Sequence, residues 1–333
     1  MKFKQWFDLR GSKYIFKRGV ALLRRYNFTP SKAIDRVENC MAKLAEYGCS
    51  PTFPTPGRVV QRYPKFIRHL QEIGAEIAVH SYDHVDLCLY PPIEAREQLI
   101  KAAQVFARHG ISVSGFRCPY LSFPDALFDS LPNGVFDYNS NKAIRWDRFL
   151  STDICRANKT FRVLQQLYKP ISALDTVCTP RMRSNMVEIP VCLPDDIELI
   201  DALSLSSKDI ARTWTQILRQ IHRRGELFDI LFHPELARLC QQPLVDVLRE
   251  AIFLQPKVWL ARLQDISNWW REKSNFSVEI FKTMVGLRIS FNCSDRATIL
   301  VKGLSDCISN QVQDLESFEY WDGSYYRLKT KTR

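Results

Sequence analysis

Apolar positions along the chain recur at two spacings, which predict alternating helices and strands. Ile34, Val37, Met41 and Leu44 follow a helical period, and Gly48 ends that pattern. Short apolar runs without a helical period separate such segments and are typical of strands. We expect helices at 31–47, 63–73, 93–109, 209–224, 243–253 and 263–272, and strands at 51–53, 76–79, 111–116, 187–191, 227–232 and 258–260.

The repeated strand–helix units predict an α/β fold with a parallel sheet that helices close or nearly close into a distorted (β/α) barrel. Residues 141–186 are less regular and indicate an excursion between two barrel strands. After about residue 275, apolar and polar residues alternate, which is typical of antiparallel strands. We therefore expect a basic N-terminal arm at 1–25, a barrel at 26–273 and a small β-rich C-terminal appendix at 274–333.

The net charge of +11 over 333 residues favours anionic partners. Residues 1–25 hold eight basic residues against Asp8 alone, with aromatic residues between them. Two interpretations stay open: a solvated basic arm folded over the barrel, or peripheral contact with an anionic membrane. We find no signal peptide and no apolar stretch of the ~20 residues that a transmembrane helix needs, so we expect a cytoplasmic protein.

Other site classes find little support in the chain. The ten cysteines are scattered without a Cys-x-x-Cys pair, which favours buried small side chains over a zinc ribbon or disulfide framework. Cys118 is the cysteine of interest because it lies within a motif described below. We find no Gly-rich phosphate loop, Gly-x-Ser-x-Gly elbow or nucleic-acid module, and we expect no nucleic-acid partner.

Three predicted strands lead directly into polar residues of catalytic type. His80 and His84 follow the strand at 76–79, Arg117 follows the strand at 111–116, and His233 follows the strand at 227–232. In parallel barrels the residues after the strands form the active face. If the segment after His80 turns helically, His80 and His84 point the same way and can hold one divalent ion.

Four stretches of the chain resemble motifs of the polysaccharide deacetylases, the NodB-homology family or carbohydrate esterase family 4. The phrase from Glu72 to His84 resembles the family's second motif, and Pro51–Gly57 resembles the strand segment before it. Arg117–Tyr120 is similar to the Arg-x-Pro-Tyr motif, and Leu231–Pro234 is similar to the late Leu-x-His-Pro motif. The resemblance spans about residues 26–272 and implies the deacetylase type of barrel.

The resemblance also implies a site. His80 and His84 match two ligands of a divalent metal, with zinc expected and cobalt or nickel as alternatives. Arg117 matches an arginine that orients the catalytic base, and His233 matches the general acid that protonates the leaving amine. Pro119 and Tyr120 match residues that shape the oxyanion and substrate groove. The implied reaction is hydrolysis of acetyl groups on an N-acetylated sugar or glycan.

The acidic half of the family's site is thin in this chain. The first motif, Thr-Phe-Asp-Asp-Gly, aligns with residues 27–31, where Thr29 and Pro30, or Pro30 and Ser31, replace the two carboxylates. Asn139 occupies a further acidic position, and we keep Asp137 as a catalytic candidate. The other carboxylates near the predicted site are interpreted as surface charges or helix caps: Asp35, Glu38, Asp83, Glu188, Asp195, Asp196 and Glu235.

Two hypotheses follow. The first is a metal-dependent deacetylase with an atypical third ligand, favoured by the presence of His80, His84, Arg117 and His233. The second is a catalytically degenerate protein that binds glycan or serves in an assembly, in which the metal is absent. The missing carboxylates of the first motif favour the second hypothesis.

Overall fold

A computed structural model of the protein describes residues 31–150, 155, 157–233, 236–283, 286–294, 298–302, 315–320 and 325–330. The chain divides into two compact units, Met1–Ser267 and Asn268–Arg333. The predicted basic arm at 1–25 lies outside the described residues, as do Thr29 and Pro30 of the aligned first motif. No helix among the described residues is long and apolar enough to cross a membrane.

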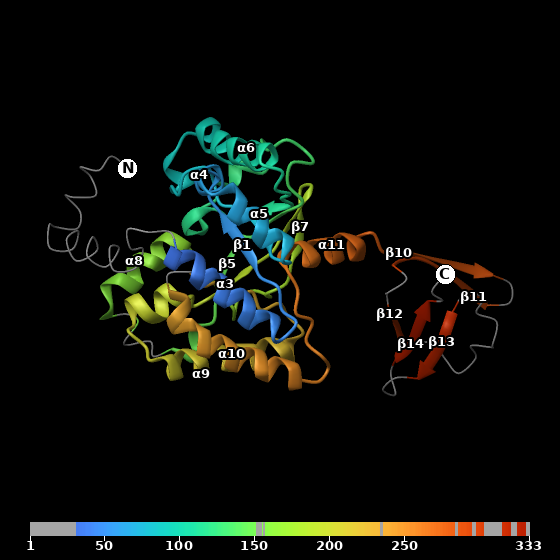
Figure 1. Ribbon diagram of the computed structural model, residues 1–333. Helices are drawn as coiled ribbons and strands as arrows, with labels where there is room; N and C mark the ends of the chain where they lie inside the picture. Colours follow the sequence, from blue (N-terminus) through green and yellow to red (C-terminus); the bar gives the residue numbers. More distant parts are fainter. Residues whose placement is uncertain are drawn as a thin grey trace. The chain divides into compact units, whose positions relative to one another are not determined.

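The first unit is built on a six-stranded sheet with the order β1-β2-β3-β4-β8-β7 (Figure 1). All neighbours pair in parallel except β7, which pairs antiparallel with β8 at the edge. The strands are β1 (Thr52–Thr55), β2 (Glu76–Val79), β3 (Gly115–Phe116), β4 (Tyr138–Asn139), β7 (Arg181–Arg183) and β8 (Met186–Glu188). The sheet therefore brings the carboxyl ends of β1, β2, β3, β4 and β8 to one edge.

A second parallel sheet continues from the first. It has the order β6-β5-β9, with β5 (Ala143–Arg145), β6 (Ile171–Ser172) and β9 (Val191–Leu193). The chain runs from β4 into β5 and from β8 into β9, and main-chain hydrogen bonds from Ile189 to Asn139 and from Val191 to Lys142 link the two runs. A parallel bridge between Cys192 and Ile230 adds the segment that leads into His233.

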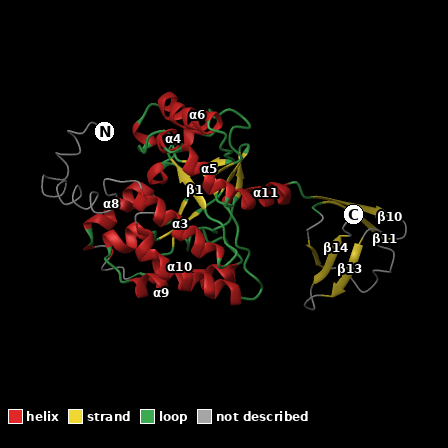
Figure 2. Ribbon diagram, viewed as in Figure 1, coloured by secondary structure: helices red, strands yellow, loops and turns green. Residues whose placement is uncertain are grey.

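Helices surround these sheets in the alternating order that the sequence predicts (Figure 2). Their ends follow local rules: α9 begins after Ser206, whose Oγ accepts the N–H of Asp209, and ends at Gly225 in the left-handed conformation. The helices are α3 (Ser31–Ala45), α4 (Gly57–Arg62), α5 (Pro64–Glu72), α6 (Pro92–Arg108), α8 (Lys159–Tyr168), α9 (Ser207–Arg224), α10 (Ala237–Phe253) and α11 (Leu263–Ser274).

Three predicted strands are shorter or absent in the structure. Residues 111–116 form a strand only at Gly115–Phe116, and residues 227–232 pair only through the bridge at Ile230. Residues 258–260 form no strand. Phe228, Phe232, Val258 and Leu260 instead pack against one buried core cluster, so an apolar run here reflects burial without a hydrogen-bonded ladder.

The second unit is rich in antiparallel strands. A hairpin joins β10 (Ser277–Thr283) to β11 (Gly286–Asn292), and a three-stranded sheet has the order β12-β14-β13. The latter strands are Thr298–Lys302, Leu315–Tyr320 and Tyr325–Thr330. This unit begins six residues before the predicted boundary at 274, within α11.

Glu76 connects several elements at the amino end of β2, although only 3% of its surface is exposed. Its carboxylate accepts hydrogen bonds from the hydroxyls of Thr52 (2.7 Å) and Tyr138 (2.5 Å) and from the N–H of Gln264 (2.9 Å). Burial raises the pKa of Glu76, and these three donors oppose that rise. The side chain thus joins β1, β2, β4 and α11.

Replacing Glu76 should therefore destabilise the first unit more than removal of one of its hydrogen bonds. Glu76→Ala leaves several buried donors without an acceptor, at about 1–3 kcal/mol each, whereas Tyr138→Phe removes one hydrogen bond worth about 1 kcal/mol. Urea unfolding of the two variants measures this difference. Equal losses of unfolding free energy would show that the carboxylate does not hold these elements together.

Candidate active site

His80 and His84 lie together just beyond the carboxyl end of β2. Their ring centroids are 5.1 Å apart, in an edge-to-face arrangement. The segment between them is not helical, because Ser81 adopts the left-handed conformation (φ 62°) and turns the chain. The helical premise is therefore wrong, but the two imidazoles still meet.

A hydrogen bond fixes the orientation of His80. Its Nδ1 lies 2.5 Å from the main-chain oxygen of Arg117 and therefore donates to it. This places the ring hydrogen on Nδ1 and leaves the Nε2 lone pair for a metal, as in metal-binding histidines generally. Burial, with smaller contributions from the basic neighbours His84, Arg117 and His233, lowers the pKa of His80 to about 3, so the ring is neutral at pH 7.

Arg117 is the first residue after β3, and its side chain is 6% exposed. Its Nε donates to the main-chain oxygen of Ser140 (3.0 Å), and its Nη2 donates to Ser140 Oγ (2.7 Å). The same Nη2 forms an ion pair with Oδ2 of Asp229. Arg117 thus contacts β2 through its carbonyl oxygen, and β4 and the segment before His233 through its guanidinium.

Pro119 and Tyr120 follow Arg117 in a short 3₁₀ turn, Pro119–Leu121. Tyr120 and Leu121 both have positive φ, at 60° and 54°, which is uncommon for residues other than glycine. This backbone places the Tyr120 ring 5.2 Å from the His84 ring, edge to face. Strained backbone of this kind gathers at functional sites, and here it brings the Arg-x-Pro-Tyr motif to the histidine pair.

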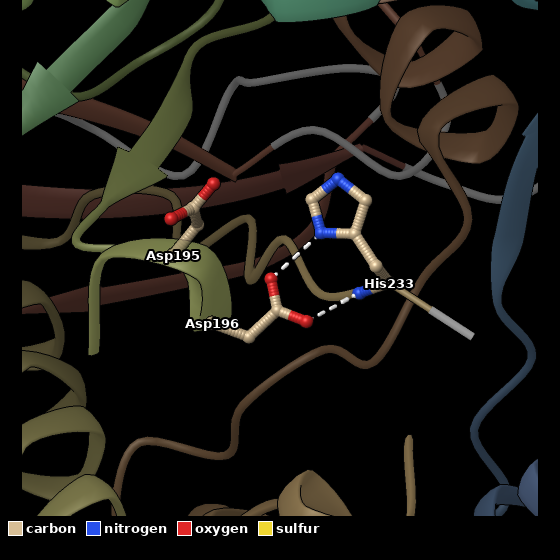
Figure 3. A group of neighbouring side chains, drawn as sticks. All are labelled: Asp195, Asp196 and His233. Carbon is tan, nitrogen blue, oxygen red and sulfur yellow. Dashed lines mark hydrogen bonds and ion pairs between the residues drawn. The ribbon is translucent and has the colours of Figure 1, made fainter. Parts of the chain in front are cut away.

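His233 is held from two sides by Asp196 (Figure 3). Asp196 Oδ2 accepts the main-chain N–H of His233 at 2.6 Å, and Asp196 Oδ1 lies 2.7 Å from His233 Nδ1. Asp196 is fully buried, whereas the His233 side chain is 32% exposed. The carboxylate fixes both the position and the tautomer of the imidazole, as is usual for histidines that transfer protons.

Asp195 next to this pair is also fully buried. Its Oδ1 accepts the N–H of Glu198 (2.8 Å), and its Oδ2 lies 2.9 Å from the Tyr168 hydroxyl. Burial, followed by the nearby charges of Glu198 and Asp196, raises the pKa of Asp195 to about 8. Asp195 therefore carries a proton at neutral pH.

A metal would find two imidazole donors at His80 and His84, a donor type that suits zinc, cobalt and nickel. Among the described residues, the group of three possible ligands within 4.8 Å of one another is Asp195, Asp196 and His233. The oxygens of that group are already engaged by hydrogen bonds, so we interpret it as a positioned histidine. In the described part of the chain, no carboxylate completes the His80–His84 pair.

Several candidate carboxylates lie elsewhere. Asp83 forms an ion pair with Arg58 (2.5 Å), and Asp35 and Glu38 are exposed on α3. Asp137 is exposed and precedes β4, and its N–H bonds to Ser114 O. In the parallel register this is the amino edge of the sheet, whereas Arg117 and Ser140 lie at the carboxyl edge, so the structure does not bring Asp137 to the histidines. Glu235 lies outside the described residues.

The sequence interpretation misplaced three acidic residues and missed a fourth. Glu188, Asp195 and Asp196 are buried and are not surface charges. Asp229 was not considered, although it lies four residues before His233. Asp195 and Asp196 follow β9 after Pro194, and that position just after a buried strand was the signal available. Cys118 is fully buried, and burial raises the pKa of its thiol, so it is not a reactive cysteine.

Comparisons with known proteins agree with this architecture. Residues 32–133 match the family model described as polysaccharide deacetylase. The chain is similar to a structure from Mycobacterium smegmatis described as a polysaccharide deacetylase, at 19% identity over 80% of this chain and 86% of that chain, with a TM-score of 0.57. A search of curated proteins gives no significant match.

Two further solved structures are similar to the chain. One from Pseudomonas aeruginosa PAO1, also described as a polysaccharide deacetylase, has 17% identity, with 74% of each chain covered and a TM-score of 0.56. PuuE allantoinase has 16% identity, with 74% of each chain covered and a TM-score of 0.56. At these identities the likenesses establish a shared fold.

The two adjacent aspartates should respond differently to replacement by asparagine. Asp195→Asn mimics the protonated carboxyl and should change the unfolding free energy little below about pH 4. The raised pKa means that wild type loses stability relative to Asp195→Asn as pH rises from about 4 to about 8.

Asp196→Asn removes one of two acceptors for His233 and should cost about 1–3 kcal/mol. Urea unfolding at pH 5 and pH 9 tests both predictions. If the unfolding free energy of wild type rises relative to that of Asp195→Asn between pH 5 and pH 9, the protonated state of Asp195 is contradicted.

Proposed function

The chain belongs to the polysaccharide deacetylase family, and on this premise we propose that it is a hydrolase that removes acetyl groups from an N-acetylated sugar or glycan with a divalent metal. The observation that carries the proposal is the hydrogen bond from His80 Nδ1 to the Arg117 oxygen. It presents a neutral imidazole beside His84 for metal binding. Partial exposure of His80 and exposure of His84 leave the pair open to an external substrate.

His80 and His84 would hold the metal, with zinc as the expected ion and cobalt or nickel as alternatives. When bound, such an ion polarises the acetamide carbonyl and makes water a better nucleophile. The family's first motif supplies a carboxylate as the third ligand, and this chain has Thr29 and Pro30 at the aligned positions.

His233 would donate a proton to the nitrogen of the leaving amine. Its ring is fixed through Nδ1 by Asp196, so the other ring nitrogen is directed away from that carboxylate (Figure 3). Proton donation by a positioned group contributes typically 10²–10⁴-fold to a rate. Tyr120, whose ring contacts that of His84, would border the substrate beside the histidine pair.

A second function has one specific observation in its favour. No carboxylate among the described residues joins His80 and His84 within the reach of a shared ion. A site whose histidine pair lacks an acidic ligand for the metal would bind a glycan without hydrolysing it. Metal content and acetate release distinguish the two functions.

Metal binding should depend on the histidine pair. Purified wild-type protein, soaked with zinc and desalted, should hold about one zinc ion per chain by elemental analysis, and His80→Ala/His84→Ala should hold negligible zinc. His222→Ala is the matched control. His222 lies on α9, its Nε2 forms a hydrogen bond with the main-chain oxygen of Pro256, and it is far from His80 and His84 in the sequence. Negligible metal in wild type after soaking with zinc, cobalt and nickel would contradict a metal-dependent reaction.

Acetate release should depend on His233. We expect wild type to release acetate from N-acetylglucosamine oligomers or peptidoglycan fragments, and His233→Ala to lower kcat about 10²–10⁴-fold with its metal retained. Enzymatic acetate determination measures both rates, and His222→Ala should match wild type. Glycan binding without acetate release by wild type would favour the second function.

A further inference from the structure

Arg117 carries a charge that the fold must neutralise inside the protein. Its side chain is 6% exposed, and a buried cation without an anionic partner costs several kcal/mol. The family resemblance implies that this arginine orients a carboxylate of the first motif. This chain has Thr29 and Pro30 at the aligned positions. In the structure, the carboxylate that pairs with Arg117 belongs to Asp229.

Asp229 is held in place by its backbone as well as by its side chain. Its main-chain oxygen accepts the N–H of Cys192 on β9 (3.0 Å), and the next residue, Ile230, forms the parallel bridge to Cys192. Its Oδ2 accepts hydrogen bonds from Arg117 Nη2 and from Ser140 Oγ (3.3 Å). Asp229 therefore has little freedom to rotate away from Arg117.

The second carboxylate oxygen of Asp229 is in a different situation. Oδ1 accepts no hydrogen bond from any described residue, and the side chain retains 11% exposure. One oxygen clamped by an arginine and the other open to a small molecule is the arrangement that a general base requires. Arg117 also links this carboxylate to the histidine pair, because its main-chain oxygen accepts from His80 Nδ1.

We infer that Asp229 supplies the general base that the first motif lacks and that Arg117 orients it. This rests on the proposed deacetylation. Asp229 Oδ1 takes a proton from water as the water oxygen bonds to the acetyl carbon, and the carbonyl electron pair moves to its oxygen. As that pair returns, the bond from the carbon to nitrogen breaks, and the nitrogen takes a proton from His233. The products are acetic acid, which ionises to acetate, and the free amine; Asp229 releases its proton to solvent and His233 regains one from solvent.

The test compares Asp229→Asn with wild type. Asparagine has nearly the same shape, and its oxygen can still accept from Arg117, but it cannot accept a proton near neutral pH. We expect kcat for acetate release to fall at least about 100-fold, with KM and zinc content within error of wild type; loss of the anion beside Arg117 should lower the melting temperature while the protein stays folded at the assay temperature. Glu188→Gln is the matched control: Glu188 is a similarly buried carboxylate paired with Arg181 and Arg183 of the edge strand β7, and its variant should keep the wild-type kcat.

A second variant separates a base from a buried ion pair. Asp229→Ala leaves space where a small carboxylate can enter. Added formate should therefore raise the rate of acetate release by this variant at least tenfold, and the increase should saturate with formate concentration. Asp229→Asn with kcat within threefold of wild type, or Asp229→Ala without response to formate, would overturn the inference while the deacetylation stands. A wild-type chain that releases no acetate would overturn the proposed function and this inference together.

Discussion

The buried guanidinium of Arg117 is the constraint on which the site depends. Arg117 lies at the carboxyl end of β3. Its main-chain oxygen accepts a hydrogen bond from His80 Nδ1, and its guanidinium donates hydrogen bonds to Ser140 and Asp229. Three neighbouring parallel segments therefore meet through one residue. Because a charge at 6% exposure cannot be left without an anion, the position of Asp229 is coupled to that of β3.

Short strands make this coupling effective. β3 and β4 are two residues long, so the ladder ends almost at once and the next residues are held by side-chain hydrogen bonds. Two departures from regular backbone, at Ser81 and Tyr120, then bring side chains of the segments after β2 and β3 toward one another. The strain of these left-handed residues is offset by the surrounding contacts, which include the Gly57 N–H to the Ser81 oxygen (3.0 Å).

Local features of the chain were predictable, whereas pairing between distant segments was not. Helical periods and terminal glycines located α3, α5, α6, α9 and α11 to within a few residues, but α4 and α8 were not predicted and α10 begins six residues earlier than expected. The motif around His80 identified the histidine pair. The strand predicted at 227–232 was wrong because an apolar run reports burial and not ladder partners. Asp137 left the candidate set because its edge of the sheet depends on the register of β3 with β4, which no local pattern encodes. For the same reason Asp196 was misinterpreted as a surface charge and Asp229 was not considered.

Two described carboxylates that bind basic residues of the site, Asp196 and Asp229, come from the second half of the barrel. Asp196 lies just after β9. Asp229 lies beside β9, because the next residue, Ile230, forms a parallel bridge with Cys192 of that strand. Each binds a basic residue that the motifs identify, His233 and Arg117 respectively. The pairing of Cys192 with Ile230 therefore helps to position the segments of Asp196 and Asp229 relative to each other, and with them His233 and Arg117. The contacts of Asp196 and Asp229 thus involve the pairing of β9 with the segment before His233, whereas the histidine pair depends on β2 and on the Arg117 oxygen that accepts the His80 Nδ1–H.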